Sequence, residues 1–441
     1  MSSATLAAAR EQLIDLYRAA VAGANVEALT TNAVASVPLE RRHRVWVFAF
    51  GKAAHAMANA ACTTLQRSLA EIAGGLVVAQ ESGPAPCSTV SVLVGDHPIP
   101  GRRSFTAAAR IGQTLTKKRA ADLGIVLLSG GTSSLIGAPL RGMSEADLSH
   151  LYELLLGSGL DIHQMNAVRK RFSYWAAGRM ALALAPARTF CFAVSDVPGD
   201  DLASIGSGPC VADPTRVQHI MEILKRVDLF GKIAPSFRQY LLDTARGVIP
   251  ETPKDSHPAF AHVDARVIAS NAIALNAAAA AARRHGFDTL VEDEPLVGDA
   301  AEAGARVADV LLTMGVHDNG GATHCRLWGG ETTVSLRGPA PAGGRCQELA
   351  LAAAQRLATA GERASSIAIL AAGTDGRDGT TNAAGAIIDG ATWDAIRAAA
   401  HDPAASLRMH ESHAALASVN ALFSPGLTGT NVMDVVIGLV N

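Results

Sequence analysis

Short apolar runs alternate with amphipathic segments along most of the chain. The run RVWVFAF (44–50) is followed by apolar residues at helical spacing, and further runs occur at GLVVA (75–79), VSVLV (90–94), GIVLL (124–128) and TFCFAV (189–194). Uninterrupted apolar runs are typical of strands buried on both faces of a parallel sheet, and the segments between them predict covering helices. The alternation predicts an α/β fold.

The pattern changes between residues 247 and 260, where GVIPETPKDSHPAF carries three prolines and no periodicity. A chain of 441 residues exceeds what one hydrophobic core usually serves. We therefore expect an N-terminal domain over residues 1–250 and a C-terminal domain over residues 259–441. The second half begins again with a predicted strand and helix in ARVIASNAIALNAAAAAARRHGF, and IAILAAG (367–373) predicts a later strand. Both domains are predicted to be α/β, with largely parallel sheets flanked by helices.

Composition excludes several classes of protein. The formal net charge is −2 and no basic stripe is visible, which argues against a nucleic-acid partner. The longest uncharged run contains Gly, Pro, Asn and His, and charged residues appear early at the N-terminus, so neither a membrane span nor a secretory signal is expected. Six scattered cysteines without a C-x-x-C pair argue against zinc and disulfide scaffolds. A cytoplasmic protein is expected, and a homodimer stays open.

Candidate chemistry gathers where predicted strands end, which is where open α/β sheets carry their sites. Lys52 follows the first run at a strand-to-helix turn, where a positive charge is unfavourable unless an anion binds. Asp196 follows the run ending at residue 194, and a carboxylate there suits a general base or a Mg²⁺ ligand. A solvated lysine and an acidic surface loop are the plain alternatives.

A glycine-rich turn follows the run GIVLL. Backbone N–H groups and hydroxyls at such a turn can hold an anion, but Ser and Thr are also ordinary helix caps, and the sequence leaves both interpretations open. The residues concerned are Gly130, Gly131, Thr132, Ser133 and Ser134.

Two polar segments in the second half complete the set. Arg345 follows two glycines at a predicted helix start, where a guanidinium fits a phosphate or carboxylate. In the loop GTDGRDGTT, Asp375 and Asp378 are oxygen ligands of the kind that Mg²⁺ prefers, and Thr374 is a predicted substrate- or phosphate-binding residue. Neither a G-x-x-x-x-G-K-[ST] loop nor a G-x-G-x-x-G turn after a strand is present, which excludes P-loop NTPases and ordinary NAD-fingerprint dehydrogenases.

The ordered motifs together resemble the glycerate 2-kinases with a MOFRL C-terminal domain. The motifs that carry the resemblance are FGKAAHAM, GDHPIPG, LSGGTSSL, MNAVRKRFS, SDVPGDDLASIGSGP, GGETTV, GGRCQELAL, GTDGRDGTTNAAGA and GLTGTNVMD. The resemblance implies an active site in the cleft between two α/β domains, a MOFRL region near 320–435, and phosphorylation of the 2-hydroxyl of D-glycerate by ATP with Mg²⁺. Lys52 and Arg345 match the family's lysine and arginine thought essential for activity, and Asp196 matches its SDV aspartate.

These residues suggest a mechanism. Lys52 is expected to bind the phosphate chain, Arg345 the substrate carboxylate or the transferring phosphoryl group, and Asp196 to act as base or Mg²⁺ ligand. Asp375 and Asp378 would hold Mg²⁺ or orient Thr374. One alternative is an NAD(P)H-dependent reductase of hydroxypyruvate or tartronate semialdehyde, because members of this family often carry that label. Another is a sensor of small acids that has lost turnover.

Overall fold

The computed structural model describes residues 3–39, 43–314, 323–336 and 341–441. Its chain divides into two compact units. One comprises residues 26–268, and the other, here called the composite unit, joins residues 1–25 to residues 269–441.

The 26–268 unit is built on a six-stranded sheet of order β3-β2-β1-β4-β5-β6. Each of the pairings β3–β2, β2–β1, β1–β4 and β4–β5 is parallel, as the alternation of apolar runs and helices predicts. Every predicted run of the first half forms one of its strands. The strands are β1 (Arg44–Phe50), β2 (Glu71–Ala79), β3 (Val90–Val94), β4 (Leu123–Leu128), β5 (Arg188–Val194) and β6 (Val263–Ala269).

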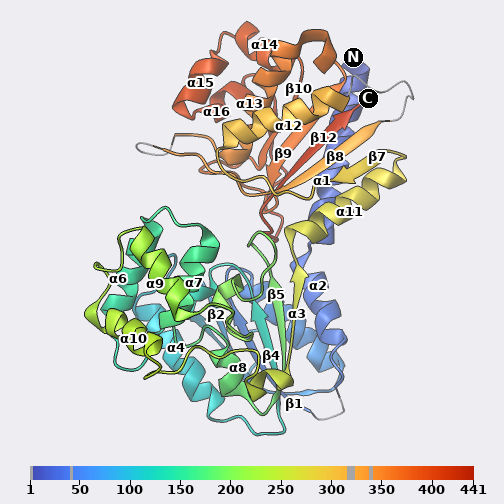
Figure 1. Ribbon diagram of the computed structural model, residues 1–441. Coiled ribbons are helices and arrows are strands. Elements are labelled where there is room, and N and C mark those ends of the chain that lie inside the picture. Colours follow the sequence, from blue (N-terminus) through green and yellow to red (C-terminus); the bar gives the residue numbers. More distant parts are fainter. Residues whose placement is uncertain (1–2, 40–42, 315–322, 337–340) are drawn as a thin grey trace. The chain divides into compact units, whose positions relative to one another are not determined.

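Helices cover this sheet, and a helical subdomain extends it (Figure 1). Trp46, Phe48 and Phe50 alternate along β1 and share one core cluster with side chains of α4 and α8. Helices α6, α7, α9 and α10 enclose a separate apolar cluster. The helices are α2 (Val26–Ala35), α3 (Ala54–Arg67), α4 (Arg102–Leu115), α5 (Thr132–Leu135), α6 (Glu145–Leu156), α7 (Ile162–Phe172), α8 (Arg179–Leu184), α9 (Val217–Arg226) and α10 (Pro235–Ala245).

The composite unit has a six-stranded sheet of order β11-β10-β9-β12-β8-β7. Here the prediction of a largely parallel sheet is wrong, because only β7–β8 pairs in parallel and the other four pairings are antiparallel. Buried strands such as IAILAAG carry no signal of direction, since both faces are apolar in either arrangement. The strands are β7 (Asp288–Val291), β8 (His324–Gly330), β9 (Ile367–Gly373), β10 (Gly385–Asp389), β11 (Leu422–Phe423) and β12 (Asp434–Val440).

Helices α12 and α13 pack on one face of this sheet, and α1 and α11 pack against the opposite face (Figure 1). Helix α1 therefore belongs with the second sheet, although the sequence boundary places it in a domain over residues 1–250. Strand β6 is the reverse case. It lies within the predicted C-terminal domain of residues 259–441, but it pairs with the first sheet. The helices are α1 (Ser3–Gly23), α11 (Asn271–Arg284), α12 (Ala300–Met314), α13 (Arg345–Ala360), α14 (Thr392–Ala398), α15 (Pro403–Met409) and α16 (Ser412–Ala417).

The segment MNAVRKRFSYWAAGRMALALA has apolar residues at helical spacing, but it forms two helices, the end of α7 and the whole of α8. Ala177 and Gly178 between them have positive φ angles of 52° and 77°, which a continuous helix does not allow. Among the described helices, none is both long and apolar enough to cross a membrane.

Candidate active site

Lys52, Asp196 and the Gly130–Gly131 turn lie at the carboxyl ends of the neighbouring strands β1, β4 and β5. The backbone N–H of Lys52 donates to the carbonyl oxygen of Gly130 at 2.9 Å, and the Lys52 side chain is exposed. A Cβ atom built on Gly130 would lie only 2.1 Å from Oδ2 of Asp196, so glycine is required for this approach. The sheet thus brings together a lysine and an aspartate that are 144 positions apart in the sequence.

The carboxyl group of Asp196 is electrostatically perturbed. Burial raises the pKa of Asp196 above its ordinary value, and the positive charge of Lys52 opposes part of that rise. A carboxylate with a raised pKa beside a lysine suits proton abstraction from a hydroxyl group.

The hydroxyl groups of the predicted anion cradle are already engaged. Thr132 is fully buried, and its Oγ1 donates to the carbonyl oxygens of Phe50 (2.9 Å) and Ser129 (2.7 Å). Ser134 Oγ donates to the carbonyl oxygen of Gly131 at 3.1 Å. Thr132 and Ser134 therefore hold the turn in shape, because their hydroxyl groups donate to backbone carbonyl oxygens.

Ser133 connects the turn to other elements. Its Oγ hydrogen-bonds with Oγ of Ser207 at 2.7 Å, and its carbonyl oxygen accepts from the hydroxyl of Tyr152 at 3.0 Å. These contacts tie the turn to α6 and to the loop after β5.

His97 and Arg169 stand near the turn, and neither was singled out from the sequence. A Cβ atom built on Gly131 would lie 3.0 Å from Cδ2 of His97, and burial lowers the pKa of His97, with further lowering from the charges of Lys52 and Arg169. The motif GDHPIPG contains His97 and the motif MNAVRKRFS contains Arg169. Nothing in the local pattern of either motif indicates which side chain lies beside the turn.

Arg345 begins α13 in the composite unit and is held by two carboxylates. Its Nε and Nη2 donate to Oδ2 and Oδ1 of Asp434 at 2.6 and 2.9 Å, and its Nη1 donates to Glu331 at 2.6 Å. Burial opposes the charge of Arg345, but the hydrogen bonds with Asp434 and the negative charges of Asp434 and Glu331 together outweigh it and raise the pKa of Arg345 above its usual range. Neither carboxylate was a predicted site residue.

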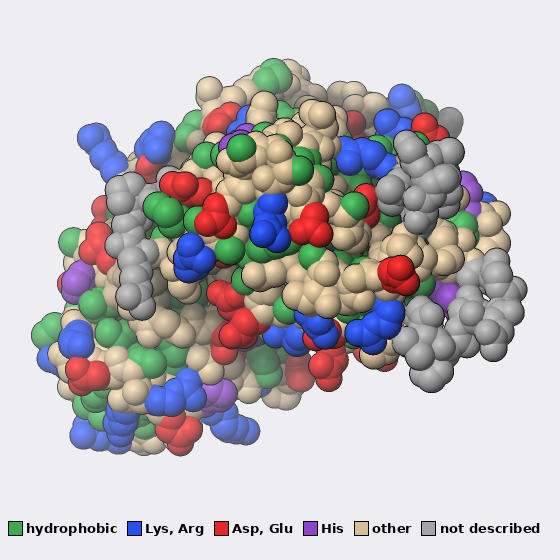
Figure 2. Space-filling view, turned by 90° about the horizontal axis from the view of Figure 1, so that it is seen from above, with side chains coloured by type: hydrophobic (Ala, Val, Ile, Leu, Met, Phe, Trp, Pro, Cys, Tyr) green, Lys and Arg blue, Asp and Glu red, His purple; other side chains and the backbone are tan. Residues whose placement is uncertain are grey.

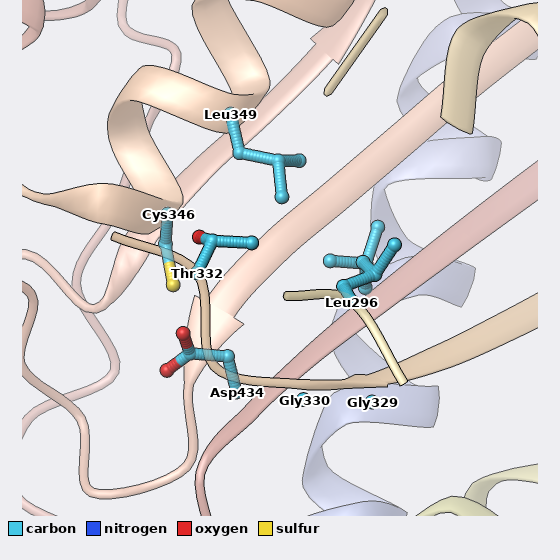
Figure 3. A pocket seen from close by; sticks show the side chains of 8 residues that line it. Leu296, Gly329, Gly330, Thr332, Cys346, Leu349 and Asp434 are labelled. Atoms are coloured by element: carbon cyan, nitrogen blue, oxygen red, sulfur yellow. The ribbon is translucent and has the colours of Figure 1, made fainter. Parts of the chain in front are cut away.

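The carboxylate of Asp434 also borders a cavity of about 10 Å³, where it lies near Cys346 and Thr332 (Figure 3). That volume is room for roughly one water molecule. The cavity is therefore too small to hold a substrate.

Thr374 follows β9 and is fully buried. Its Oγ1 donates to the carbonyl oxygen of Met433 at 2.6 Å and accepts from the backbone N–H of Val432 at 2.9 Å. These bonds join the loop after β9 to the loop before β12 and give Thr374 a structural role, while its contact with substrate stays a prediction.

Asp378 caps the N-terminus of α13. The backbone N–H groups of Cys346 and Gln347 donate to its Oδ1 and Oδ2 at 3.2 and 2.9 Å, and Gln347 Nε2 donates to Oδ2 at 3.1 Å. A Cβ atom built on Gly344 would lie 2.3 Å from the same carboxylate, so the glycine before Arg345 makes room for the cap. The polar loop after β9 is thus explained in part by helix capping.

The predicted pair of Mg²⁺ ligands is engaged in hydrogen bonds to backbone N–H groups. Both oxygens of Asp378 accept N–H groups, and Oδ1 of Asp375 accepts the backbone N–H of Arg377 at 2.9 Å. Across the described ranges, no group of three or more His, Cys, Asp or Glu side chains could hold a metal ion. Asp378 in particular could offer a cation only the lone pairs left beside the cap of α13, chiefly on Oδ1.

Comparison with known proteins gives the chain its relatives. Residues 12–242 match the family described as Domain of unknown function (DUF4147), and residues 324–434 match the MOFRL family. A glycerate 2-kinase from Pyrococcus horikoshii is 35% identical over 91% of this chain and 88% of its own length. This chain belongs to the glycerate 2-kinase family with a MOFRL domain.

Other relatives of this family agree in length and fold. A D-glycerate 2-kinase from Thermotoga maritima is 33% identical over 92% of this chain and 93% of its own. The crystal structure of a Thermotoga maritima glycerate kinase matches 98% of this chain and 100% of that one with a TM-score of 0.85 at 31% identity. An Agrobacterium vitis protein that carries a hydroxypyruvate reductase name is 36% identical over 97% of this chain and 93% of its own.

Proposed function

We propose that this protein transfers the γ-phosphoryl group of ATP to the 2-hydroxyl of D-glycerate, giving 2-phosphoglycerate and ADP. The observation that carries the proposal is the placement of Lys52 and Asp196 at neighbouring strand ends beside the Gly130–Gly131 turn. Phosphoryl transfer depends mainly on positioning and on neutralising negative charge, and it needs a group that accepts the proton of the attacking hydroxyl. The relatives named glycerate 2-kinase support the choice of substrate.

In this proposal each side chain has one role. Lys52, exposed at the end of β1, binds the phosphate chain of ATP. Asp196 takes the proton of the 2-hydroxyl, which its raised pKa favours. Arg345 binds the transferring phosphoryl group by giving up the half-exposed Glu331, while Asp434 continues to orient the guanidinium.

Magnesium enters the proposal as part of the substrate. ATP reacts as its Mg²⁺ complex, in which phosphate oxygens and water supply most of the ligands. Asp375 is the remaining candidate for a protein ligand, because Asp378 is committed to the cap of α13. We also propose a cytoplasmic location, which the six free cysteines support, since thiols persist in reducing compartments.

A coupled assay tests the proposal. Purified protein is given D-glycerate, ATP and Mg²⁺, and product is measured through enolase alone and through phosphoglycerate mutase plus enolase. Signal with enolase alone is expected, because enolase consumes 2-phosphoglycerate. Signal only with the mutase would mean attack by the 3-hydroxyl. No signal in either assay, together with consumption of NADH or NADPH on addition of hydroxypyruvate, would favour the reductase named among the relatives.

A further inference from the structure

The end of α7 carries three consecutive cations, and they differ in how their charge is compensated. All three are buried: Arg169, Lys170 and Arg171. Lys170 Nζ lies 3.4 Å from Asp213 and donates to the carbonyl oxygen of Ala203 at 2.7 Å. Arg171 hydrogen-bonds to Glu251 and lies 3.9 Å from Asp213. These two cations have carboxylate partners, as buried charges require.

Arg169 has no such partner. Arg169 is only 8% exposed. Within the described part of the chain, its guanidinium group makes no ion pair. Its contacts are a 3.4 Å hydrogen bond from Nη1 to Oδ1 of Asn166 and a 4.0 Å contact from Nη2 to the sulfur of Met165, and its Nε has no hydrogen-bond partner. A guanidinium group carries five donors, so most of its capacity is unused.

The surroundings hold Arg169 in place near the glycine-rich turn. The guanidinium lies over the ring of Tyr152 at 4.6 Å, and the hydroxyl of Tyr152 donates to the carbonyl oxygen of Ser133. Asn166, the other contact, donates from Nδ2 to the carbonyl oxygen of Ser204 at 3.1 Å. A buried cation that is oriented by neutral groups and lacks a counter-charge is suited to receive an anion from solution.

We propose that Arg169 binds the carboxylate of the hydroxy-acid substrate. This inference rests on the proposed function, in which the substrate is a small carboxylate whose hydroxyl must reach Asp196. The planar guanidinium matches a carboxylate, and binding would supply the missing counter-charge. Arg345 would then be free to act on the phosphoryl group alone.

The test compares D-glycerate with its neutral amide, 2,3-dihydroxypropanamide. In the Arg169→Met variant we expect the KM for D-glycerate to rise about 10- to 100-fold, as loss of a charged hydrogen bond predicts, while the KM for ATP stays within about twofold. Preference for the acid over the amide should fall by the same factor. Arg169→Lys should restore part of it, and Arg110→Met, which removes an exposed arginine of the same unit, should leave it unchanged.

A binding measurement without ATP separates this inference from the proposed function. D-glycerate and D-lactate should raise the melting temperature of the wild type and of Arg110→Met, but not that of Arg169→Met. If the wild type fails to phosphorylate D-glycerate but shows this pattern, the proposed function is wrong and the carboxylate site stands. Equal stabilisation of wild type and Arg169→Met, no stabilisation of the wild type, or an unchanged preference for acid over amide would overturn the inference.

Discussion

Asp196 and Lys52 are coupled through charge, and this coupling has a measurable consequence. A base must be deprotonated, so kcat/KM should fall at acid pH, with a midpoint above 3.8 because burial raises the pKa of Asp196. Lys52 holds that pKa down, so removal of its charge should move the midpoint to higher pH. We expect the residual activity of Lys52→Met to show this shift in a pH–rate profile and that of Lys52→Arg to lack it.

If the acid limb keeps the same midpoint in both Lys52 variants, Asp196 is not the titrating base. Loss of the limb in Asp196→Asn, with a folded protein, is the complementary result that we expect.

Neighbouring arginines on α7 should respond differently to the same substitution. Arg171→Met leaves Glu251 and Asp213 with one partner fewer, and breaking a buried pair typically costs about 3 kcal/mol or more. Arg169→Met removes a buried charge without an ion-pair partner in the described residues, and the lost stacking on Tyr152 costs about 1 kcal/mol. Urea unfolding of the two variants should therefore differ by roughly 2 kcal/mol. Equal losses would mean that Arg169 is a structural residue like its neighbour.

At the scale of single residues, the sequence predicts the position of functional groups better than their partners. Lys52 and Asp196 could be chosen because each follows an apolar run, and the parallel order of β1, β4 and β5 then brings them to one edge of the sheet. The carboxylates on Arg345 come from β12 and from the residue that follows β8, so no local pattern could have indicated them. The same holds for Asp378, whose role depends on a helix that begins 33 residues earlier.

Helix α13 depends on a cap from outside its own segment. Its N-cap residue, Gly344, has no side chain, and Asp378 accepts the first N–H groups instead. Burial raises the pKa of Asp378 from 3.8 to about 6, although the N–H groups of Gln347 and Cys346 oppose the rise. A pKa raised on folding adds stability below pH 4 that is lost as the pH approaches 6.

We therefore expect the unfolding free energy of the wild type, relative to that of Asp378→Asn, to fall between pH 4 and 6 by on the order of 2 kcal/mol. Denaturant titrations at several pH values measure this difference. The same variant should keep the Mg²⁺ dependence of its activity. A large increase in the Mg²⁺ requirement would show that Asp378 binds the metal as the sequence first suggests.

At the scale of elements, the sequence predicts where strands and helices lie. It does not predict which of the two sheets α1 and β6 join. The run ARVIA forms β6 as expected, but Val263, Ala265 and Val267 pack against the core of the first sheet. The predicted strand directions in the composite unit are wrong for a related reason, because buried apolar strands have the same sequence pattern in parallel and antiparallel sheets. Which strands pair depends on contacts between segments far apart in the sequence, and the periodicity of a single segment does not encode those contacts.

For the whole molecule, charge and apolar burial give different kinds of information. The face shown in Figure 2 mixes acidic and basic side chains, in keeping with the formal net charge of −2. The apolar side chains are more specific, since those of α1 decide which unit contains the N-terminus. Leu13, Leu16 and Tyr17 of α1 are almost fully buried, and the hydroxyl of Tyr17 donates to the carbonyl oxygen of Gly373 at 2.8 Å.

Helix α1 should therefore stabilise the composite unit and not the unit that follows it in sequence. Leu16→Ala should cost about 2–5 kcal/mol, as expected for a buried leucine, and should accelerate amide hydrogen exchange in β9, β12 and α11. Leu65→Ala on α3 is the matched control, because Leu65 is equally buried but α3 packs on β1 and β2. Leu65→Ala should accelerate amide hydrogen exchange in β1 and β2 instead. If Leu16→Ala instead accelerates exchange in β1 and β2, α1 belongs to the first domain, as the proline-rich boundary at residues 247–260 predicts.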